Sequence, residues 1–226
     1  MRHYSSFLLL LALLIGAPAA FAQMASRPKI SPMSRQLTDF VPPGYRIVRN
    51  GQATGDLNHD SHPDVALVLG SVAEDTIQSE DDLPARQLLV LFGTPTGYTL
   101  AAQSTKAVWC KACSGNGDPF DGLSIKQSIL LIKHDTGGNW GHRQINKFRY
   151  QQGAFYLIGE TQEYSRHAPD CDKLPYPPRY DYKESNFVTG EYDVIRTSDT
   201  CQLLEKKHGR GKHTPLIRLA DYAVKM

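Results

Sequence analysis

Hydrophobic and polar residues alternate along most of the chain, and a period of two is typical of β-strands that bury one face. Two runs, at residues 65–70 and 87–93, are apolar apart from Gln87 and predict strands that are buried on both faces. The full set of expected strands covers residues 44–49, 65–70, 87–93, 98–103, 128–134, 145–150, 154–164 and 186–198.

Helical patterning is nearly absent, since no stretch longer than about eleven residues shows a continuous apolar face at helical spacing. The best helical segment is short, at residues 35–40. Residues 151–153, Gln-Gln-Gly, favour a hairpin between two expected strands. Short connections favour antiparallel neighbours. We therefore expect a mainly β, antiparallel meander that forms a compact sandwich or a partial propeller-like sheet with few or no helices.

The first 22 residues have the pattern of a cleaved signal peptide, with Arg2, an apolar core at residues 7–15 and small residues at Ala20 and Ala22. The core is about half the length of a membrane-spanning helix, which needs roughly 20 residues. We expect residues 23–42 to form a leader or loose segment and residues 43–226 to form a single β domain. The mature chain is expected to lack a membrane span and to be periplasmic or secreted.

The charge of the mature chain is almost balanced. Without Arg2, 24 of the 25 Lys and Arg residues remain against 23 Asp and Glu residues. A nucleic-acid-binding protein usually carries a clear excess of basic residues. We therefore expect no nucleic-acid partner.

The four cysteines, Cys110, Cys113, Cys171 and Cys201, indicate disulfides, because an exported chain is exposed to an oxidising environment. We favour local pairing of Cys110 with Cys113 and of Cys171 with Cys201. A zinc site and a redox-active Cys-x-x-Cys pair are the alternatives. Zinc would need a second close-spaced pair of ligands, and a thioredoxin-like motif would need a βαβ unit.

An acidic segment precedes the first apolar strand. Side-chain oxygens occur at its first, third, fifth and ninth residues, Asp56, Asn58, Asp60 and Asp64, and His62 at the seventh can contribute a backbone carbonyl. Calcium takes six to eight oxygens at about 2.3–2.6 Å, and a tight loop with ligands at alternate residues can surround it. We predict one Ca²⁺ ion here. The alternative is a turn rich in Asp and Asn that binds no metal.

Two residues of this segment differ from an EF-hand loop. Ser61 stands where an EF-hand has glycine, and Leu67 stands where it has a bidentate glutamate. Leu67 belongs to an expected strand, so the segment is not part of a helix–loop–helix unit.

The sequence GDLNHDSHPDVALVLG, preceded by GYRIV and followed by LLVLFGTPTGY, resembles one FG-GAP or VCBS-type repeat of the integrin alpha-chain kind. The resemblance covers about residues 43–100. It implies a β-blade whose loop binds calcium through Asp56, Asn58, Asp60, the His62 carbonyl and Asp64, and it implies no activity. A propeller is built from several copies, and this chain has one, so we expect a single repeat within a compact β domain.

Aromatic residues in two loops are candidates for binding a partner. Tyr176, Tyr180 and Tyr182 lie in a proline-rich segment, and Trp140 follows a glycine-rich turn. Flat amphipathic rings on a stiff loop suit contact with a sugar or a peptide. The alternative is that these rings pack against the sheet.

The sequence contains no nucleophile elbow, zinc-protease motif, dinucleotide fingerprint or phosphate-binding loop. His134 and Asp135 are adjacent in an expected strand and therefore point to opposite faces. We expect an exported, calcium-stabilised, non-catalytic β module that binds a protein or a cell-envelope partner. The alternatives are a periplasmic inhibitor or immunity-type protein and a small hydrolase of envelope polymers.

Overall fold

The structure is a computed structural model that describes residues 28–77, 83–166 and 177–225. A five-stranded sheet contains β1 (Met33–Ser34), β2 (Tyr45–Gly55), β3 (Asp64–Ser71), β4 (Gln87–Thr94) and β5 (Gly97–Ser104). A seven-stranded sheet contains β6 (Phe120–Lys126), β7 (Ile129–Asp135), β8 (Trp140–Gln151), β9 (Ala154–Arg166), β10 (Asp181–Asn186), β11 (Glu191–Thr197) and β12 (Leu203–Arg210). Two 3-10 turns, η1 (Leu37–Phe40) and η2 (Val72–Asp75), complete the described elements.

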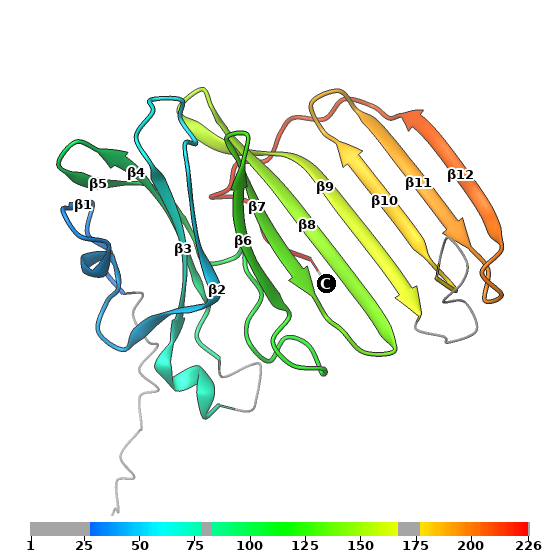
Figure 1. The fold of residues 1–226 in the computed structure, drawn as a ribbon, viewed down its shortest axis with the longest axis horizontal. Helices are drawn as coiled ribbons and strands as arrows, with labels where there is room; N and C mark the ends of the chain where they lie inside the picture. Colours follow the sequence, from blue (N-terminus) through cyan, green and yellow to red (C-terminus); the bar gives the residue numbers. More distant parts are fainter. Residues whose placement is uncertain (1–27, 78–82, 167–176, 226) are drawn as a thin grey trace, which may run out of the picture.

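Every pair of neighbouring strands is antiparallel, so the predicted fold class is confirmed. The strand orders are β1-β5-β4-β3-β2 and β12-β11-β10-β9-β8-β7-β6, and Figure 1 shows the two sheets beside each other. Most strands pair with their neighbours in sequence because short turns join them. The predicted hairpin between β8 and β9 turns at Gln152 and Gly153, whose φ angles of 50° and 77° suit a two-residue turn. Among the described residues, no helix has the length and hydropathy needed to cross a membrane.

β3 and β4 are buried on both faces, as their apolar sequences predict. One face contributes Val68 and Val90 to a core that also includes residues of the seven-stranded sheet, such as Leu130 and Phe148. The other face forms a second cluster around Leu67, Leu89 and Phe40. Phe40 belongs to the segment that we expected to be a leader or a loose end. In the structure this segment packs on the sheet through Phe40 and pairs with β5 through β1.

The two sheets meet where β2 lies against β6. Asn50 of β2 donates a side-chain hydrogen bond to the carbonyl oxygen of Asp121 at 3.0 Å. Gly55 and Gly122 allow this close approach, because a Cβ on Gly55 would lie 2.5 Å from Ile125 and one on Gly122 would lie 2.9 Å from Asn50. The junction therefore depends on small residues in both strands.

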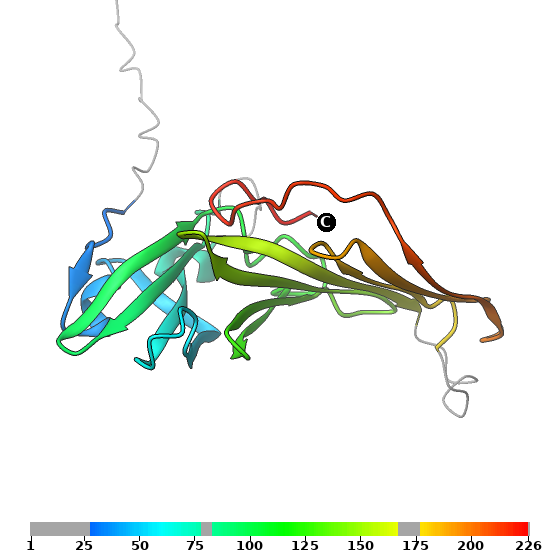
Figure 2. The same cartoon turned by 90° about the horizontal axis from the view of Figure 1, so that it is seen from above.

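β10, β11 and β12 extend beyond the shared core as a single layer of strands, most of whose side chains are exposed or half-buried (Figures 1 and 2). We call these three strands the extension. We call residues 211–225 the C-terminal segment. It runs back from β12 along one side of the seven-stranded sheet (Figure 2) and hydrogen-bonds to β9, with Leu219 N–H donating to Phe155 O at 2.8 Å.

Four strands are not among those expected from the sequence: the two-residue β1, β6, β10 and β12. Residues 205–214 are rich in basic residues and have the composition of a surface loop, but residues 205–210 belong to β12. β12 exposes side chains on both faces, so its sequence lacks the apolar alternation that marks a half-buried strand.

Candidate functional site

The acidic loop between β2 and β3 is organised by backbone amides that bind its carboxylates. Asp56 accepts hydrogen bonds from the N–H groups of His59 at 2.7 Å and Ser61 at 3.1 Å. Asp60 accepts one from His62 N–H at 2.8 Å. The φ angles of His59 and Ser61, 64° and 66°, lie in the left-handed region. Ser61 therefore supplies the turn for which an EF-hand uses glycine.

Asp60 forms most of its contacts within the loop. Its second carboxylate oxygen accepts from Asn58 Nδ2 at 2.8 Å, and the Asn58 side-chain oxygen accepts from Asp60 N–H at 3.1 Å. The His62 backbone N–H, followed by the Asn58 amide, lowers the pKa of Asp60. The Asp60 carboxylate is therefore ionised at neutral pH and available to a cation.

Asp64 has a different environment, since its carboxylate is fully buried. Its two oxygens accept from Leu57 N–H at 2.7 Å and Gly93 N–H at 2.9 Å. Desolvation raises the pKa of Asp64, and the two amides oppose that shift. A Cβ on Gly93 would lie 2.3 Å from Pro63 O, so glycine is needed where β4 meets the loop. Asp64 therefore fastens the loop to the five-stranded sheet.

The loop fits a calcium ion in part. Most of the carboxylate oxygens described above accept one hydrogen bond and retain a second lone-pair direction that a cation can use, while Asp60 Oδ1 also lies 3.3 Å from His62 Nδ1. Within residues 28–77, 83–166 and 177–225, however, no three His, Cys, Asp or Glu side chains are grouped closely enough to hold a metal. The predicted ligands thus share one loop, but Asp64 turns into the protein while Asp56, Asn58 and Asp60 remain at the surface.

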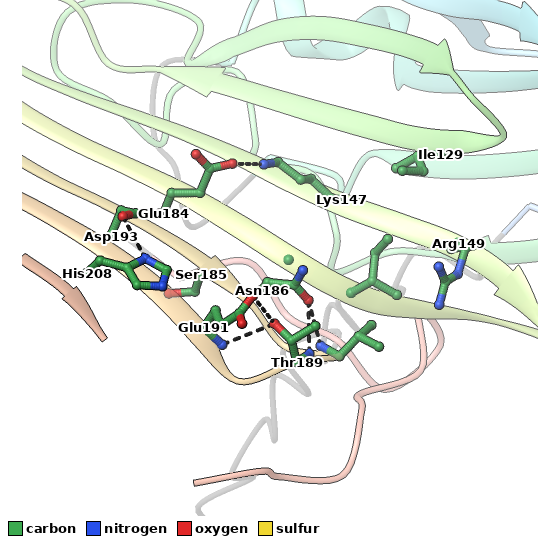
Figure 3. Close-up of a pocket in the computed structure, with 13 residues that line it drawn as sticks. Ile129, Lys147, Arg149, Glu184, Ser185, Asn186, Thr189, Glu191, Asp193 and His208 are labelled. Carbon is green, nitrogen blue, oxygen red and sulfur yellow. Dashed lines mark hydrogen bonds and ion pairs between the residues drawn. The ribbon is translucent and has the colours of Figure 1, made fainter. Parts of the chain in front are cut away.

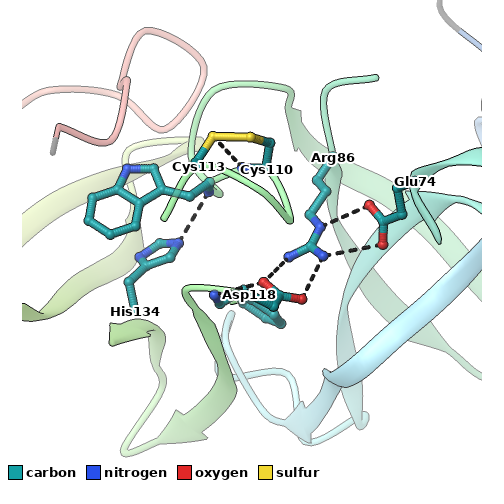
Figure 4. The surroundings of a disulfide bond; sticks show 8 residues. Glu74, Arg86, Cys110, Cys113, Asp118 and His134 are labelled. Carbon is teal, nitrogen blue, oxygen red and sulfur yellow. Dashed lines mark hydrogen bonds and ion pairs between the residues drawn. A yellow bond between two sulfur atoms is a disulfide. The ribbon is translucent and has the colours of Figure 1, made fainter. Parts of the chain in front are cut away.

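A second cluster surrounds the Cys110–Cys113 disulfide, whose predicted pairing is confirmed (Figure 4). The buried Arg86 guanidinium donates to Glu74 at 3.2 Å and to Asp118 at 2.7–2.8 Å. A buried guanidinium needs such partners, because an unpaired charge in the interior is very costly. The cluster ties the segment that carries the disulfide to the start of β4 and to η2.

Cys201 is also disulfide-bonded, while Cys171, its predicted partner, lies outside the described residues.

Two histidines lie beneath the segment that precedes the Cys110–Cys113 disulfide. His134 Nε2 accepts from Trp109 N–H at 3.3 Å, and desolvation lowers the pKa of His134 to about 3. His142 stacks on Tyr164 with 4.1 Å between ring centroids, and burial also lowers its pKa. Both rings are therefore neutral at neutral pH. Asp135 points away from His134, as expected, and pairs with Arg143 at 3.1 Å.

A pocket of about 570 Å³ (Figure 3) lies on the face of the seven-stranded sheet opposite His134 and His142. We call this side the open face. Lys147 pairs with Glu184, and His208 Nδ1 lies 3.0 Å from Asp193 Oδ1. The remaining lining residues are Ile129, Arg149, Ile158, Gly159, Ser185, Asn186, Val188, Thr189 and Glu191.

Two of the carboxylates in this pocket face each other directly. Glu184 and Asp193 are cross-strand partners of β10 and β11, and like charges in such positions destabilise a sheet. Lys147 lowers the pKa of Glu184 by hydrogen bonding, followed by a smaller effect of the Tyr182 hydroxyl. Glu184 is therefore ionised and cannot act as a proton donor at neutral pH, whereas it can bind a positively charged group.

The predicted partner-binding aromatic residues do not form one surface. Tyr182 lies on the open face, where its hydroxyl donates to Glu184 at 2.7 Å and where burial raises its pKa. Tyr180 stacks on Tyr182 with 6.1 Å between ring centroids. Trp140 is three residues from Arg143, which shares a face with Tyr182, so Trp140 points to the other face. Tyr176 lies outside the described residues.

Trp140 is 54% exposed, with the guanidinium groups of Arg166 and Arg179 lying 5.6 and 5.3 Å from its ring centroid. It can therefore still contact a partner, but from a different side of the sheet than Tyr182.

Neither the open-face pocket nor a row of polar residues on the opposite face of β8 was predicted from the sequence. His142, Gln144 and Asn146 alternate with exposed or half-buried residues and are themselves buried. Their spacing of two residues, which leads into the buried Phe148, is the signal that could have revealed them. The pocket residues come from strands that were not all expected, so no local pattern in the sequence marks them.

Comparison with known proteins adds no assignment: no protein-family model matches the chain, and neither a curated protein nor a solved structure matches it.

Proposed function

We propose that this protein is an exported binding module that recognises a charged partner, a protein or a cell-envelope polymer, on the open face of its seven-stranded sheet. The main support for the proposal is the pocket in that face. It combines aliphatic side chains of Ile129 and Ile158 with basic groups of Lys147 and Arg149 and with carboxylates on the extension. Such a mixture of an apolar floor and opposite charges is suited to recognising a polar ligand.

The ionised state of Glu184 favours binding of a cation over acid catalysis in this pocket. Glu184 is held ionised by Lys147, and the histidines with lowered pKa lie on the other face. A general acid or base needs a pKa near the working pH and access to substrate. Two disulfide-bonded sites, at Cys110–Cys113 and at Cys201, support an oxidising compartment and hence export.

We further propose that one calcium ion stabilises the loop at Asp56–Asp64, within the FG-GAP or VCBS-type repeat that the sequence resembles. The support is the density of oxygen acceptors and the ionised Asp60. The ion would act by binding the folded state, which adds about 2.7 kcal/mol when free calcium exceeds the dissociation constant 100-fold.

Capture from an envelope extract of the producing cells tests the partner proposal. The bait would be the wild-type protein, an Arg149→Glu variant and a matched Arg35→Glu variant, since Arg35 is exposed on the five-stranded side. We expect one captured species with wild type and Arg35→Glu and its loss with Arg149→Glu. Equal capture by all three proteins would refute the open face as the binding surface.

Calorimetry and thermal denaturation with calcium or magnesium test the ion. We expect a calcium-specific stabilisation that Asp60→Asn removes and that Asp121→Asn, a matched change on the exposed side of β6, retains. No calcium-specific heat or stabilisation in the wild type would show that the loop is a turn rich in Asp and Asn. That result would leave the open-face proposal intact.

A further inference from the structure

A second cavity, of about 450 Å³, lies on the opposite face of the seven-stranded sheet, beneath the C-terminal segment. Gln144, Glu160 and Gln162 line it from the sheet, and Ile217 and Tyr222 line it from the C-terminal segment. Tyr222 is buried, and its ring packs edge-on against Phe148 with 5.3 Å between centroids. The cavity therefore has a wall that belongs to the folded core and does not depend on the open face.

The polar groups at the base of this cavity are short of hydrogen-bond donors. Glu160 Oε1 accepts from Gln144 Nε2 at 2.5 Å and from Asn146 Nδ2 at 2.9 Å. Because both amide nitrogens point at this carboxylate, both amide oxygens must point away from it. Gln144 and Asn146 are 1% and 0% exposed, and each of these oxygens is buried without a hydrogen-bond partner among the described residues. Of the two residues only Gln144 lines the cavity, while the Asn146 side chain lies against the Tyr222 hydroxyl.

Buried amide oxygens without donors destabilise a fold, because the hydrogen bonds that they make to water in the unfolded chain are lost and not replaced. A bound group that brings N–H or O–H donors removes this cost. Glu160 adds negative charge at the same point, and Asp221 adds more at the cavity wall, against the exposed Lys225. The expected ligand is thus a donor with positive charge.

The other walls of the cavity indicate what kind of molecule carries the positive charge of the ligand. Leu157, Phe187 and Ile217 give the cavity an apolar side. The volume is many times the roughly 30 Å³ that one water occupies in the liquid, so the space accommodates an organic chain. An aliphatic chain that ends in a cation matches both the apolar side and the acceptor-rich base.

Because Glu160 Oε1 already accepts two hydrogen bonds, some cations fit this carboxylate better than others. A guanidinium pairs best with both oxygens of a carboxylate at once, and Oε1 already accepts two amide hydrogen bonds. A primary ammonium is a compact charge with three donors and needs only one carboxylate oxygen. We propose that this cavity binds a primary ammonium group on an aliphatic chain, either a free amine or a lysine side chain of a peptide, with Glu160 and Gln144 as its acceptors.

Nuclear magnetic resonance titration of the full chain with three probes tests the proposal. The probes are pentylamine, Nα-acetyl-lysine methylamide and 1-pentanol, which has the same chain but no charge. We expect both amines to shift the signals of Tyr222 and Phe187 with saturable, millimolar binding, and 1-pentanol to bind at least about tenfold more weakly. Tighter binding of the lysine derivative would identify a peptide ligand, and tighter binding of pentylamine would identify a free amine.

Two variants test which residues accept hydrogen bonds from the ammonium group. Glu160→Gln removes the charge, and Gln144→Leu removes the amide oxygen, so each is expected to weaken amine binding about tenfold or more. Gln103→Leu, an exposed glutamine on β5, is the matched control and is expected to bind normally. If Gln144→Leu fails to fold, the wild-type titration and Glu160→Gln still decide the question.

Three outcomes would overturn the proposal: no shift at Tyr222 or Phe187 with either amine, equal binding of 1-pentanol, or unchanged amine binding by Glu160→Gln. Any of these would mean that ordered water satisfies the two amide oxygens. None of them bears on capture through Arg149, which lies on the other face.

Discussion

β3 and β4 lie between two hydrophobic clusters, whereas β10, β11 and β12 have exposed or half-buried side chains along nearly their whole length. The first pair is stabilised by burial on both faces, and each fully buried leucine contributes on the order of 1.5–3 kcal/mol. The extension is held by main-chain pairing and by ion pairs such as Lys147–Glu184, and exposed pairs of this kind contribute only about 0–1 kcal/mol.

The two regions differ in what they contribute: β3 and β4 contribute burial, and the extension contributes accessible polar groups. β3 and β4 contribute to both hydrophobic clusters and leave little polar chemistry accessible, because nearly all of their side chains are buried. The extension contributes little burial and presents the facing carboxylates of Glu184 and Asp193. A local arrangement that disfavours folding is expected where a surface serves binding. This difference supports the proposal that a partner binds to the extension and the adjoining strands β8 and β9.

Truncation of a leucine in each region should give the largest contrast. Leu89→Ala removes a side chain that is 0% exposed in the second cluster, and we expect a loss of about 2–5 kcal/mol in the free energy of unfolding. Leu204→Ala on β12 removes one that is 68% exposed, and we expect a change within about 0.5 kcal/mol. Urea denaturation of both variants measures this contrast. Similar losses at the two sites would mean that β12 is buried in solution.

The buried His134 should make stability depend on pH. Its pKa is about 3 in the folded protein and 6.5 in its unperturbed state, so below pH 6.5 the unfolded chain binds a proton that the folded protein does not. Stability is then complete above pH 6.5 and falls by up to about 1.4 kcal/mol per pH unit towards pH 3.

His134→Gln keeps a hydrogen-bond acceptor and cannot titrate, so it should flatten this dependence. His208→Gln changes an exposed histidine on β12 and is the matched control. Urea denaturation between pH 4 and 7 measures how the free energy of unfolding changes with pH. The slope is proportional to the number of protons taken up on unfolding, which is roughly one for each such histidine. An unaltered slope in His134→Gln would contradict the neutral, buried state of this ring.

The smallest effect is expected from the ion pair in the open face. Glu184 has a lowered pKa, so its contribution to stability is present above its ordinary value of 4.5 and is lost as the pH falls through the lowered one. Lys147→Met should cost less than about 1 kcal/mol at pH 7, since Glu184 is partly exposed to solvent. It should also raise the pKa of Glu184, measurable by carboxyl carbon resonances. An unchanged Glu184 pKa would show that the pair does not form in solution.

The sequence could predict the strands with one buried face or two, because burial leaves an apolar pattern. It predicted the tight turn at Gln152 and Gly153 and the pairing of Cys110 with Cys113 for reasons that are local. It could not predict β12, since Leu203–Arg210 forms a strand through its pairing with β11 and not through its own alternation.

The candidate sites also differ in how far the sequence could predict them. The acidic loop is continuous in sequence, so its acceptors could be identified, although the inward turn of Asp64 toward Gly93 depends on β4 and could not. The open-face pocket joins Lys147 of β8 to Glu184 of β10 and His208 of β12. Only the register of five neighbouring strands brings these residues together, from β8 to β12.

Site-specific photo-cross-linking in the producing cells tests the central claim most directly. A photoreactive residue would replace Asn186 at the edge of the open-face pocket or, as the control, Gln103 on the five-stranded sheet. Recognition through the open face predicts a discrete cross-linked product from position 186 and none from position 103. A product from position 103 alone, or equal products from both positions, would contradict it.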